Sequence, residues 1–256
     1  MFFTDAVYVG IDPASSRKAF SYAAIDHDLN ILALADGEME DLAAFLDGQG
    51  SAVVAVNAPS HLNCGSVRRM LESGSPIPGS RQIRGADIRL AEYELRERGI
   101  QVAGTPSRSE LCASWVQAGF GLYDRLARMG FIPTPAGDAS HQWLETHPHA
   151  CFYVMLEQSP LPRLSLEGRL QRQLILYERG LRLKDAMVFF EEITRFKLLK
   201  GLLPMELVYP PEALDVLAAA YTAWLAVHHP DQTSRIGEAQ EGEITLPGFL
   251  KSEYQA

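Results

Sequence analysis

The sequence predicts an α/β protein built on a mixed sheet. Three features carry this prediction: a meander of apolar runs near the N-terminus, a helical pattern after it, and a fourth apolar run. Residues 7–12, 19–25 and 31–35 are rich in apolar, β-branched and aromatic residues. The turns between them are too short for a parallel crossover, which needs about a dozen residues. These three strands should therefore be antiparallel.

The fourth strand is predicted over residues 52–57, a continuous apolar run typical of a strand covered on both faces. Apolar residues at helical spacing over 39–46 precede it, so a right-handed crossover would place it parallel to the first strand. Asp12 and Asn57 would then end neighbouring strands. Ligands of open α/β sheets bind at such carboxyl ends, so we expect a polar site there.

The middle of the chain is less regular. Glycine and proline recur over 60–82, which predicts a long loop or lid. Helices are expected over 83–98 and 110–129, each followed by glycine, and a fifth strand over 142–146. Residues 166–200 are predicted to be helical, with many basic positions. Pro148 is expected to open a short helix.

A final apolar helix is predicted from Pro210 to Ala226, and Asp215 is the one charge inside its apolar run. Helical spacing places Asp215 over small residues that allow a close approach to a sheet. A lone carboxylate on such a face must be solvated, paired or bound to metal. The alternative is that Asp215 only favours the N-terminal end of the helix.

The bulk composition bounds the class of protein. The 256 residues are 47% hydrophobic, enough for one large domain over 1–256, and three widely spaced cysteines suggest no disulfide framework. No run is long and apolar enough for a membrane span, and no leader pattern is present, so we expect a cytoplasmic protein without a membrane partner.

The net charge of −9 argues against tight, sequence-independent binding to nucleic acid. The charge is uneven: −7 over 1–60 and −6 over 201–256, but +4 over 161–200. Acidic ends and a basic middle suit carboxylates at a metal with arginines around it. A solvated basic helix face explains the middle equally well.

Six motifs, read in order, resemble domain-of-unknown-function family 429, a family regarded as ribonuclease H-like and as containing predicted nucleases. They span nearly the whole chain, and each is weak alone. The motifs are VYVGIDPA (7–14), VAVNAPS (54–60), RGADIRL (84–90), LETHPHA (144–150), LDVLAAAYTA (214–223) and EGEITLP (241–247).

The resemblance implies a ribonuclease H-like domain, with a mixed five-stranded sheet in the order 3-2-1-4-5 flanked by helices. Residues 60–130 and 156–205 would be insertions. It also implies a site that binds Mg²⁺ or Mn²⁺ through Asp12, Asn57, Glu145 and Asp215, which would serve as metal ligands and catalytic groups. Asn57 departs from the pattern, because many such proteins have aspartate there. Its amide oxygen can bind Mg²⁺ but adds no charge.

Three cationic residues are candidates for binding substrate. Arg84 and Arg89 are expected on one helix, where they would either meet a phosphate or form surface ion pairs. Lys18 lies in the first hairpin turn after Asp12.

The function that these residues favour is a metal-dependent phosphodiester hydrolase, a nuclease acting on nucleic acid or a nucleotide. Two alternatives stay open. One is a non-catalytic binding protein that keeps the fold, motivated by Asn57. The other is a nucleotide-binding phosphotransferase of the actin and sugar-kinase type, motivated by the polar turn that contains Lys18.

Overall fold

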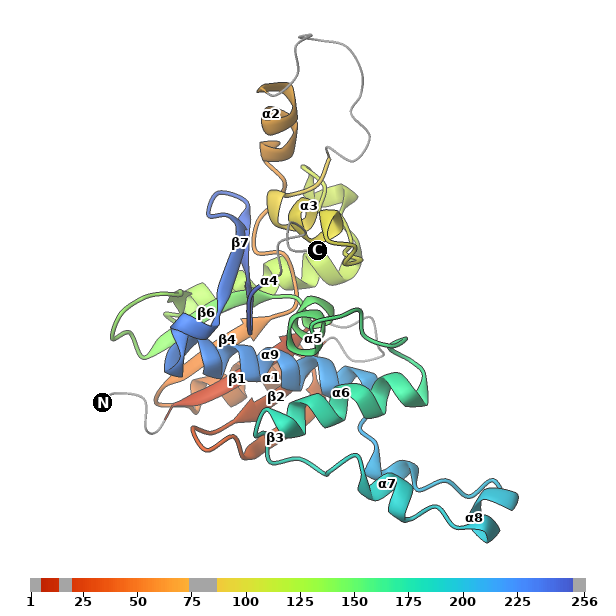
Figure 1. The fold of residues 1–256 in the computed structure, drawn as a ribbon. Coiled ribbons are helices and arrows are strands. Elements are labelled where there is room, and N and C mark those ends of the chain that lie inside the picture. The colour runs from red at the N-terminus through yellow and green to blue at the C-terminus, as the bar shows by residue number, and fades with distance from the viewer. Residues whose placement is uncertain (1–5, 14–19, 74–86, 251–256) are drawn as a thin grey trace.

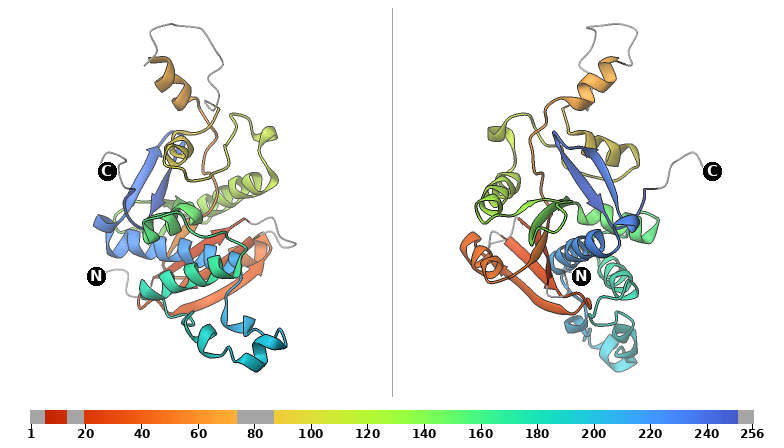
Figure 2. Two further views of the ribbon diagram at one scale, coloured as in Figure 1. Left: turned by 45° about the vertical axis from the view of Figure 1, so that its right-hand side comes forward. Right: turned by 90° about the vertical axis from the view of Figure 1, so that its left-hand side faces the viewer.

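The computed structural model describes residues 6–13, 20–73 and 87–250. These residues form a mixed eight-stranded sheet flanked by helices (Figures 1 and 2). The strand order is β3-β2-β1-β4-β6-β8-β7, and β5 pairs with β6 away from this path. The sheet is therefore larger than the five strands expected from sequence.

The N-terminal elements agree with the predicted meander and crossover. Strands β1 and β2 are antiparallel, as are β2 and β3, whereas β1 and β4 are parallel. The elements are β1 (Val7–Asp12), β2 (Phe20–Ile25), β3 (Ile31–Gly37), α1 (Met39–Asp47) and β4 (Ala52–Val56).

Residues 60–98 differ from the prediction in two places, one more helical than predicted and one less helical. The expected loop over 60–82 contains α2, and the described part of the helix expected over 83–98 becomes helical at Leu90; residues 74–86 lie outside the described residues. Arg89 caps this helix, because its backbone N–H donates to the Glu92 carboxylate (3.1 Å). The elements are α2 (Ser66–Ser73), α3 (Leu90–Glu97), η1 (Ser109–Leu111), α4 (Ser114–Arg128), β5 (Ile132–Pro133), β6 (His141–Thr146) and α5 (Pro148–Leu156).

The predicted helix over 166–200 is broken. Its first part ends before Gly180, whose φ of 93° suits glycine, and two short helices follow after an irregular connection. The elements are α6 (Leu166–Glu178), α7 (Val188–Glu191), α8 (Arg195–Leu199), η2 (Met205–Leu207), α9 (Pro211–His228), η3 (Pro230–Gln232), β7 (Ser234–Glu238) and β8 (Gly242–Leu246).

The C-terminal hairpin is what extends the sheet. No strand is predicted over residues 241–247, but most of them form β8. Strand β8 pairs in parallel with β6 over only two residue pairs and with β7 along its whole length. Two strands of five residues each, partly polar, give a weak sequence signal.

Two layers of helices cover the sheet. Helices α5, α6 and α9 pack on one face and α1 and α4 on the other, so the strands between them have buried side chains on both sides. Figure 1 shows α9 lying along the sheet, in front of β1 and β2.

Gly10 allows the closest contact between the sheet and α9. A Cβ atom at this position would overlap the carbonyl oxygen of Val216 and lie 2.5 Å from the Ala220 nitrogen. Both neighbours are backbone atoms of a buried helix, so neither can move without shifting α9. Because Asp12 follows Gly10 by two residues in the same strand, it lies on the face that α9 covers.

We predict that Gly10→Ala lowers the free energy of unfolding by about 1 to 3 kcal/mol or more, as expected for overpacking a core. Urea denaturation measures the change. Gly50→Ala is the matched control, because a Cβ there meets nothing within 4 Å. Equal stability of the two variants would contradict the close contact.

Candidate active site

A cavity of about 550 Å³ opens at the carboxyl ends of β1, β4 and β6. The parallel register pairs Ile11 with Val56 and Val56 with Glu145, so the polar residues at these strand ends lie side by side. Helix α9, the loop before α6, and residues of α3 and α4 form the rest of the wall. The polar side chains lining it include Asp12, Asn57, Glu145, His147, Arg163 and Asp215.

Asp12 is the last residue of β1 and is half-buried. Burial and the nearby charge of Asp215 raise the pKa of Asp12 to about 7, although the Asn57 side chain hydrogen-bonds to it and Arg163 lies near. The structure therefore brings Asp12, Asn57 and Asp215 together, as expected. The Asn57 backbone N–H also donates to the Ile11 carbonyl (2.8 Å), which fixes the start of the loop after β4.

Asp215 is buried in the second turn of α9. Its carboxylate accepts a hydrogen bond from Arg163 Nε (2.6 Å), and Arg163 also lies 3.4 Å from Glu212. Burial raises the pKa of Asp215 even though the Arg163 charge opposes the shift. Asp215 is thus paired with a cation and does not merely favour the helix end.

The loop before α6 presents Arg163 to the cavity, and the sequence did not single this residue out. Gly168 lets the loop lie against α6, because a Cβ there would overlap the Pro162 carbonyl oxygen. Arg172 ties the same loop to α6, since its Nη1 donates to Leu161 O in the loop (2.8 Å) and to Gly168 O in α6 (2.9 Å). The basic excess over 161–200 was the signal that could have indicated such a residue.

Glu145 reaches the cavity but is held by a buried ion pair. Arg89 donates to both of its carboxylate oxygens, from Nη2 (2.5 Å) and Nη1 (3.0 Å), and the Ser60 backbone N–H adds a third hydrogen bond (2.8 Å). Arg89 also pairs with Glu92 at 2.8 Å and is only 1% exposed. Neither side chain is thus an unpaired group facing a ligand.

This ion pair is packed against the start of β8. Gly242 has a φ of 88°, and a Cβ there would lie 2.8 Å from Glu145 Oε2 and 3.0 Å from Arg89 Nη1. Arg89 further donates to the Glu241 carbonyl (2.9 Å). The Glu-Gly pair of the EGEITLP motif therefore closes over the ion pair.

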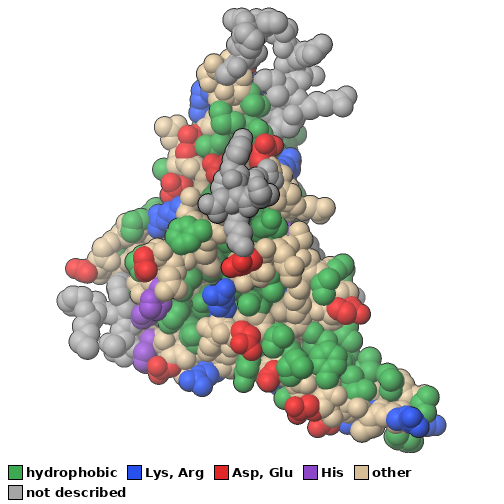
Figure 3. Space-filling model, in the orientation of Figure 1, with side chains coloured by type: hydrophobic (Ala, Val, Ile, Leu, Met, Phe, Trp, Pro, Cys, Tyr) green, Lys and Arg blue, Asp and Glu red, His purple; other side chains and the backbone are tan. Residues whose placement is uncertain are grey.

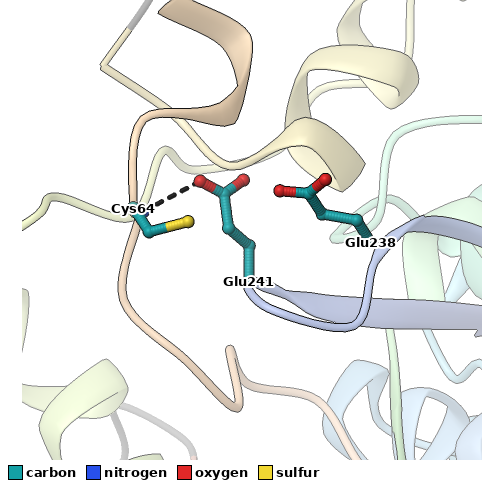
Figure 4. Close-up of side chains that lie close together, drawn as sticks. All are labelled: Cys64, Glu238 and Glu241. Atoms are coloured by element: carbon teal, nitrogen blue, oxygen red, sulfur yellow. Dashed lines mark hydrogen bonds between the residues drawn. The ribbon is translucent and has the colours of Figure 1, made fainter. Parts of the chain in front are cut away.

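The Glu241 carboxylate ties three segments together. Oε1 accepts the backbone N–H groups of Cys64 (2.8 Å) and Ser66 (3.0 Å), and Oε2 accepts that of Leu90 (2.8 Å) at the start of α3. Burial opposes its ionisation, but these hydrogen bonds prevail and lower the pKa of Glu241. Figure 4 shows Glu241 with Cys64 and Glu238. In the described residues this is the one set of three His, Cys, Asp or Glu side chains whose possible metal-ligand atoms all lie within 4.8 Å of one another.

His147 and Trp115 also line the cavity, although neither was a predicted site residue. Burial and the nearby His149 lower the pKa of His147 to about 4, so its ring is neutral at pH 7. Its Nδ1 accepts the Ala150 N–H (3.2 Å) at the start of α5, which places the ring proton on Nε2. Two of the predicted substrate-binding residues, Lys18 and Arg84, lie outside the described residues.

We predict that Arg89→Met lowers the free energy of unfolding by about 3 to 5 kcal/mol, because it leaves Glu92 and Glu145 buried without their cation. Chemical denaturation gives the value. Arg235→Ala is the control, because its pairing with Glu243 (3.6 Å) is partly exposed and should contribute less than about 1 kcal/mol. If Arg89→Met cost no more than the control, the buried network would not support the fold.

Asp12→Asn should change how stability depends on pH. Asp12 has a raised pKa in the folded state, so the wild type binds this proton more tightly when folded and loses stability as pH rises from about 4 to about 7. The amide of the variant cannot ionise, so the variant should gain about 4 kcal/mol over wild type across this window, and the difference should stay constant at higher pH. Thermal melts from pH 4 to pH 9 measure this, with Asp124→Asn, an exposed position, as control. Parallel curves for wild type and Asp12→Asn would contradict the crowding of the two carboxylates.

Among the described helices, none combines the length and apolar content needed to cross a lipid bilayer. Neither a search of curated proteins nor a search of solved structures found a match. One family model, described as "Protein of unknown function (DUF429)", matches residues 10–241. This range contains the second half of β1, the cavity residues from Asp12 to Asp215, and Glu241, and the chain therefore belongs to domain-of-unknown-function family 429.

Proposed function

We propose that this protein is a metal-dependent phosphodiester hydrolase. The observation that carries the proposal is the crowding of Asp12 and Asp215 in one cavity, where burial and mutual repulsion raise the pKa of Asp12 to about 7. Two carboxylates held together in this way favour a divalent cation, which would neutralise their repulsion.

The donor set fits Mg²⁺ or Mn²⁺. Asp12 and Asp215 supply carboxylate oxygens and Asn57 an amide oxygen, all of the hard type that these ions prefer. Glu145 is less suited than expected, because Arg89 and the Ser60 N–H already take up its oxygens. When bound, the metal would polarise a phosphoryl oxygen and lower the pKa of a water molecule.

The fold assignment in this proposal is ribonuclease H-like. The run β3-β2-β1-β4-β6 within the larger sheet, with its antiparallel meander and parallel crossover, supports it. The carboxylates also lie at the end of the first strand and on a late helix, where the resemblance of the sequence motifs implies them. Strands β7 and β8 would then be an addition to the five-stranded core.

The remaining cavity residues have roles that suit a phosphodiester. Arg163 is the cation beside Asp215, and its guanidinium can bind a phosphate oxygen once the metal takes up the Asp215 charge. His147 is neutral and carries its proton on Nε2, so it can donate a hydrogen bond to a substrate oxygen. Trp115 offers an aromatic face on which a base can stack.

Nucleic acid or a nucleotide is the substrate class that we propose. The net charge of −9 repels long polyanions, so the binding energy must come from the cavity and its metal and not from a basic surface. We therefore expect short or single-stranded substrates to be cleaved better than long duplexes.

The test is hydrolysis of bis(p-nitrophenyl) phosphate and of single-stranded DNA and RNA oligonucleotides with Mg²⁺ or Mn²⁺. Asp12→Ala should lower kcat/KM at least about 100-fold, the effect typical of removing one group that stabilises charge in the transition state. Asp124→Ala, on the exposed face of α4, is the control and should keep full activity. No hydrolysis by the wild type, or hydrolysis that Asp12→Ala retains, would refute the proposal.

A further inference from the structure

A segment between α6 and α9 projects from the body of the protein. We call residues 184–207, which contain α7, α8 and η2, the arm; it extends to the lower right in Figure 1. The second view in Figure 2 also shows it standing away from the sheet and its covering helices. The arm lies well outside the residues that line the candidate active site.

The root of the arm is anchored to α6. Phe189 and Val208 are buried with Leu170 of α6 in a small apolar cluster. Gln173, also on α6, donates to the backbone carbonyls of Lys184 (2.8 Å) and Leu207 (2.9 Å), one at each end of the arm. The arm is thus held at both ends and presents a defined surface.

The surface of the arm is strongly apolar. Half of the exposed large hydrophobic side chains of the described residues lie on this short segment, and Leu199 reaches 80% exposure. Figure 3 shows the resulting apolar patch at the lower right. A contiguous exposed apolar surface indicates an interaction site. Its residues are Met187, Val188, Phe190, Phe196, Leu198, Leu199, Leu202, Leu203 and Met205.

Charges on the arm are separated along its length. The root carries Asp185, Glu191 and Glu206 and one cation, Lys184, whose Nζ donates to the Glu206 carbonyl (2.7 Å), whereas the tip carries Arg195 and Lys200. Among the described residues, the one ion pair within the arm is Lys197 with Glu192 (2.9 Å). The exposed charges of Glu191, Glu206, Arg195 and Lys200 are therefore available to a partner.

We propose that the arm binds the arm of a second copy of this chain, antiparallel, about a twofold axis. In this arrangement the basic tip of each arm meets the acidic root of the other, and both apolar surfaces are covered. The self-complementary charge separation is what identifies the partner as another copy. Because the twofold axis relates the two copies, each attractive pair of charges occurs twice in the interface.

A lipid surface fits the arm less well. The tip has cations and apolar side chains, but the exposed Met187, Val188 and Phe190 lie at the root beside Glu191. An anionic bilayer that received the tip would leave these residues uncovered and would repel the carboxylates and the acidic body.

The test is sedimentation equilibrium of the full chain over a range of concentrations. The wild type should reach twice the mass of one chain, and Leu199→Glu should raise the dimer dissociation constant at least about tenfold because it places a charge in the apolar contact. Leu111→Glu is the matched control, since Leu111 is 67% exposed but lies outside the arm, and it should dimerise as the wild type does. Circular dichroism checks that both variants fold.

Charge reversal tests the antiparallel geometry. Arg195→Glu with Lys200→Glu, and separately Glu191→Lys with Glu206→Lys, should each weaken self-association. Mixing the two variants should restore dimers. In the mixed dimer the acidic tip of one variant meets the basic root of the other, and the acidic root meets the basic tip, so both contacts are attractive. A wild type that stays monomeric, a mixture that does not recover, or a monomer that sediments with phosphatidylserine vesicles would overturn the proposal.

Discussion

The close approach of β1 to α9 at Gly10 is the contact on which the candidate active site depends. The missing side chain lets the backbone of α9 lie directly against the strand, beside Val216. Asp215 is the residue before Val216 and Asp12 lies two residues beyond Gly10, so the same contact brings the two carboxylates to one cavity. The strand and the helix bury Asp12 and keep the Asp215 charge near it, and both effects, burial first, raise the pKa of Asp12.

A second network fixes the rest of the cavity. Arg89 joins Glu92 and Glu145 in the interior, and the carboxylate of Glu241 holds the loop before α2 and the start of α3. Buried charges of this kind are tolerated only when every partner is present. The network therefore fixes the positions of the segments that supply its members. Its members come from separate parts of the chain. The arrangement leaves Asp12, Asn57 and Asp215 as the groups that we propose bind a ligand.

The sequence was most informative where one local rule decides the structure. Short turns predicted the antiparallel meander, and the helical crossover predicted that Asp12 and Asn57 end neighbouring parallel strands. The lone charge of Asp215 in an apolar helix predicted a carboxylate that is solvated, paired or bound to metal, and the structure pairs it with Arg163. These elements and this juxtaposition of side chains are present in the structure.

Features set by contacts distant in sequence were not predictable in this way. Nothing local shows that Arg89 will be buried between Glu92 and Glu145, so the sequence allows either a phosphate contact or a surface ion pair for this residue. Arg163 lies in an irregular loop whose position depends on Gly168 and Arg172 in the following helix. The β7–β8 hairpin was missed because its strands are short and partly polar, and its link to β6 spans only two residue pairs.

The most direct test of the central claim is Mn²⁺ binding measured by calorimetry on the purified protein. We predict one or more sites that Asp12→Asn and Asp215→Asn each weaken strongly, since each variant removes a negative charge from the cavity. Glu238→Gln, which alters the carboxylates near Cys64, should leave binding unchanged. Absence of binding at millimolar Mn²⁺, or binding that only Glu238→Gln weakens, would contradict the assignment of the metal site to Asp12, Asn57 and Asp215.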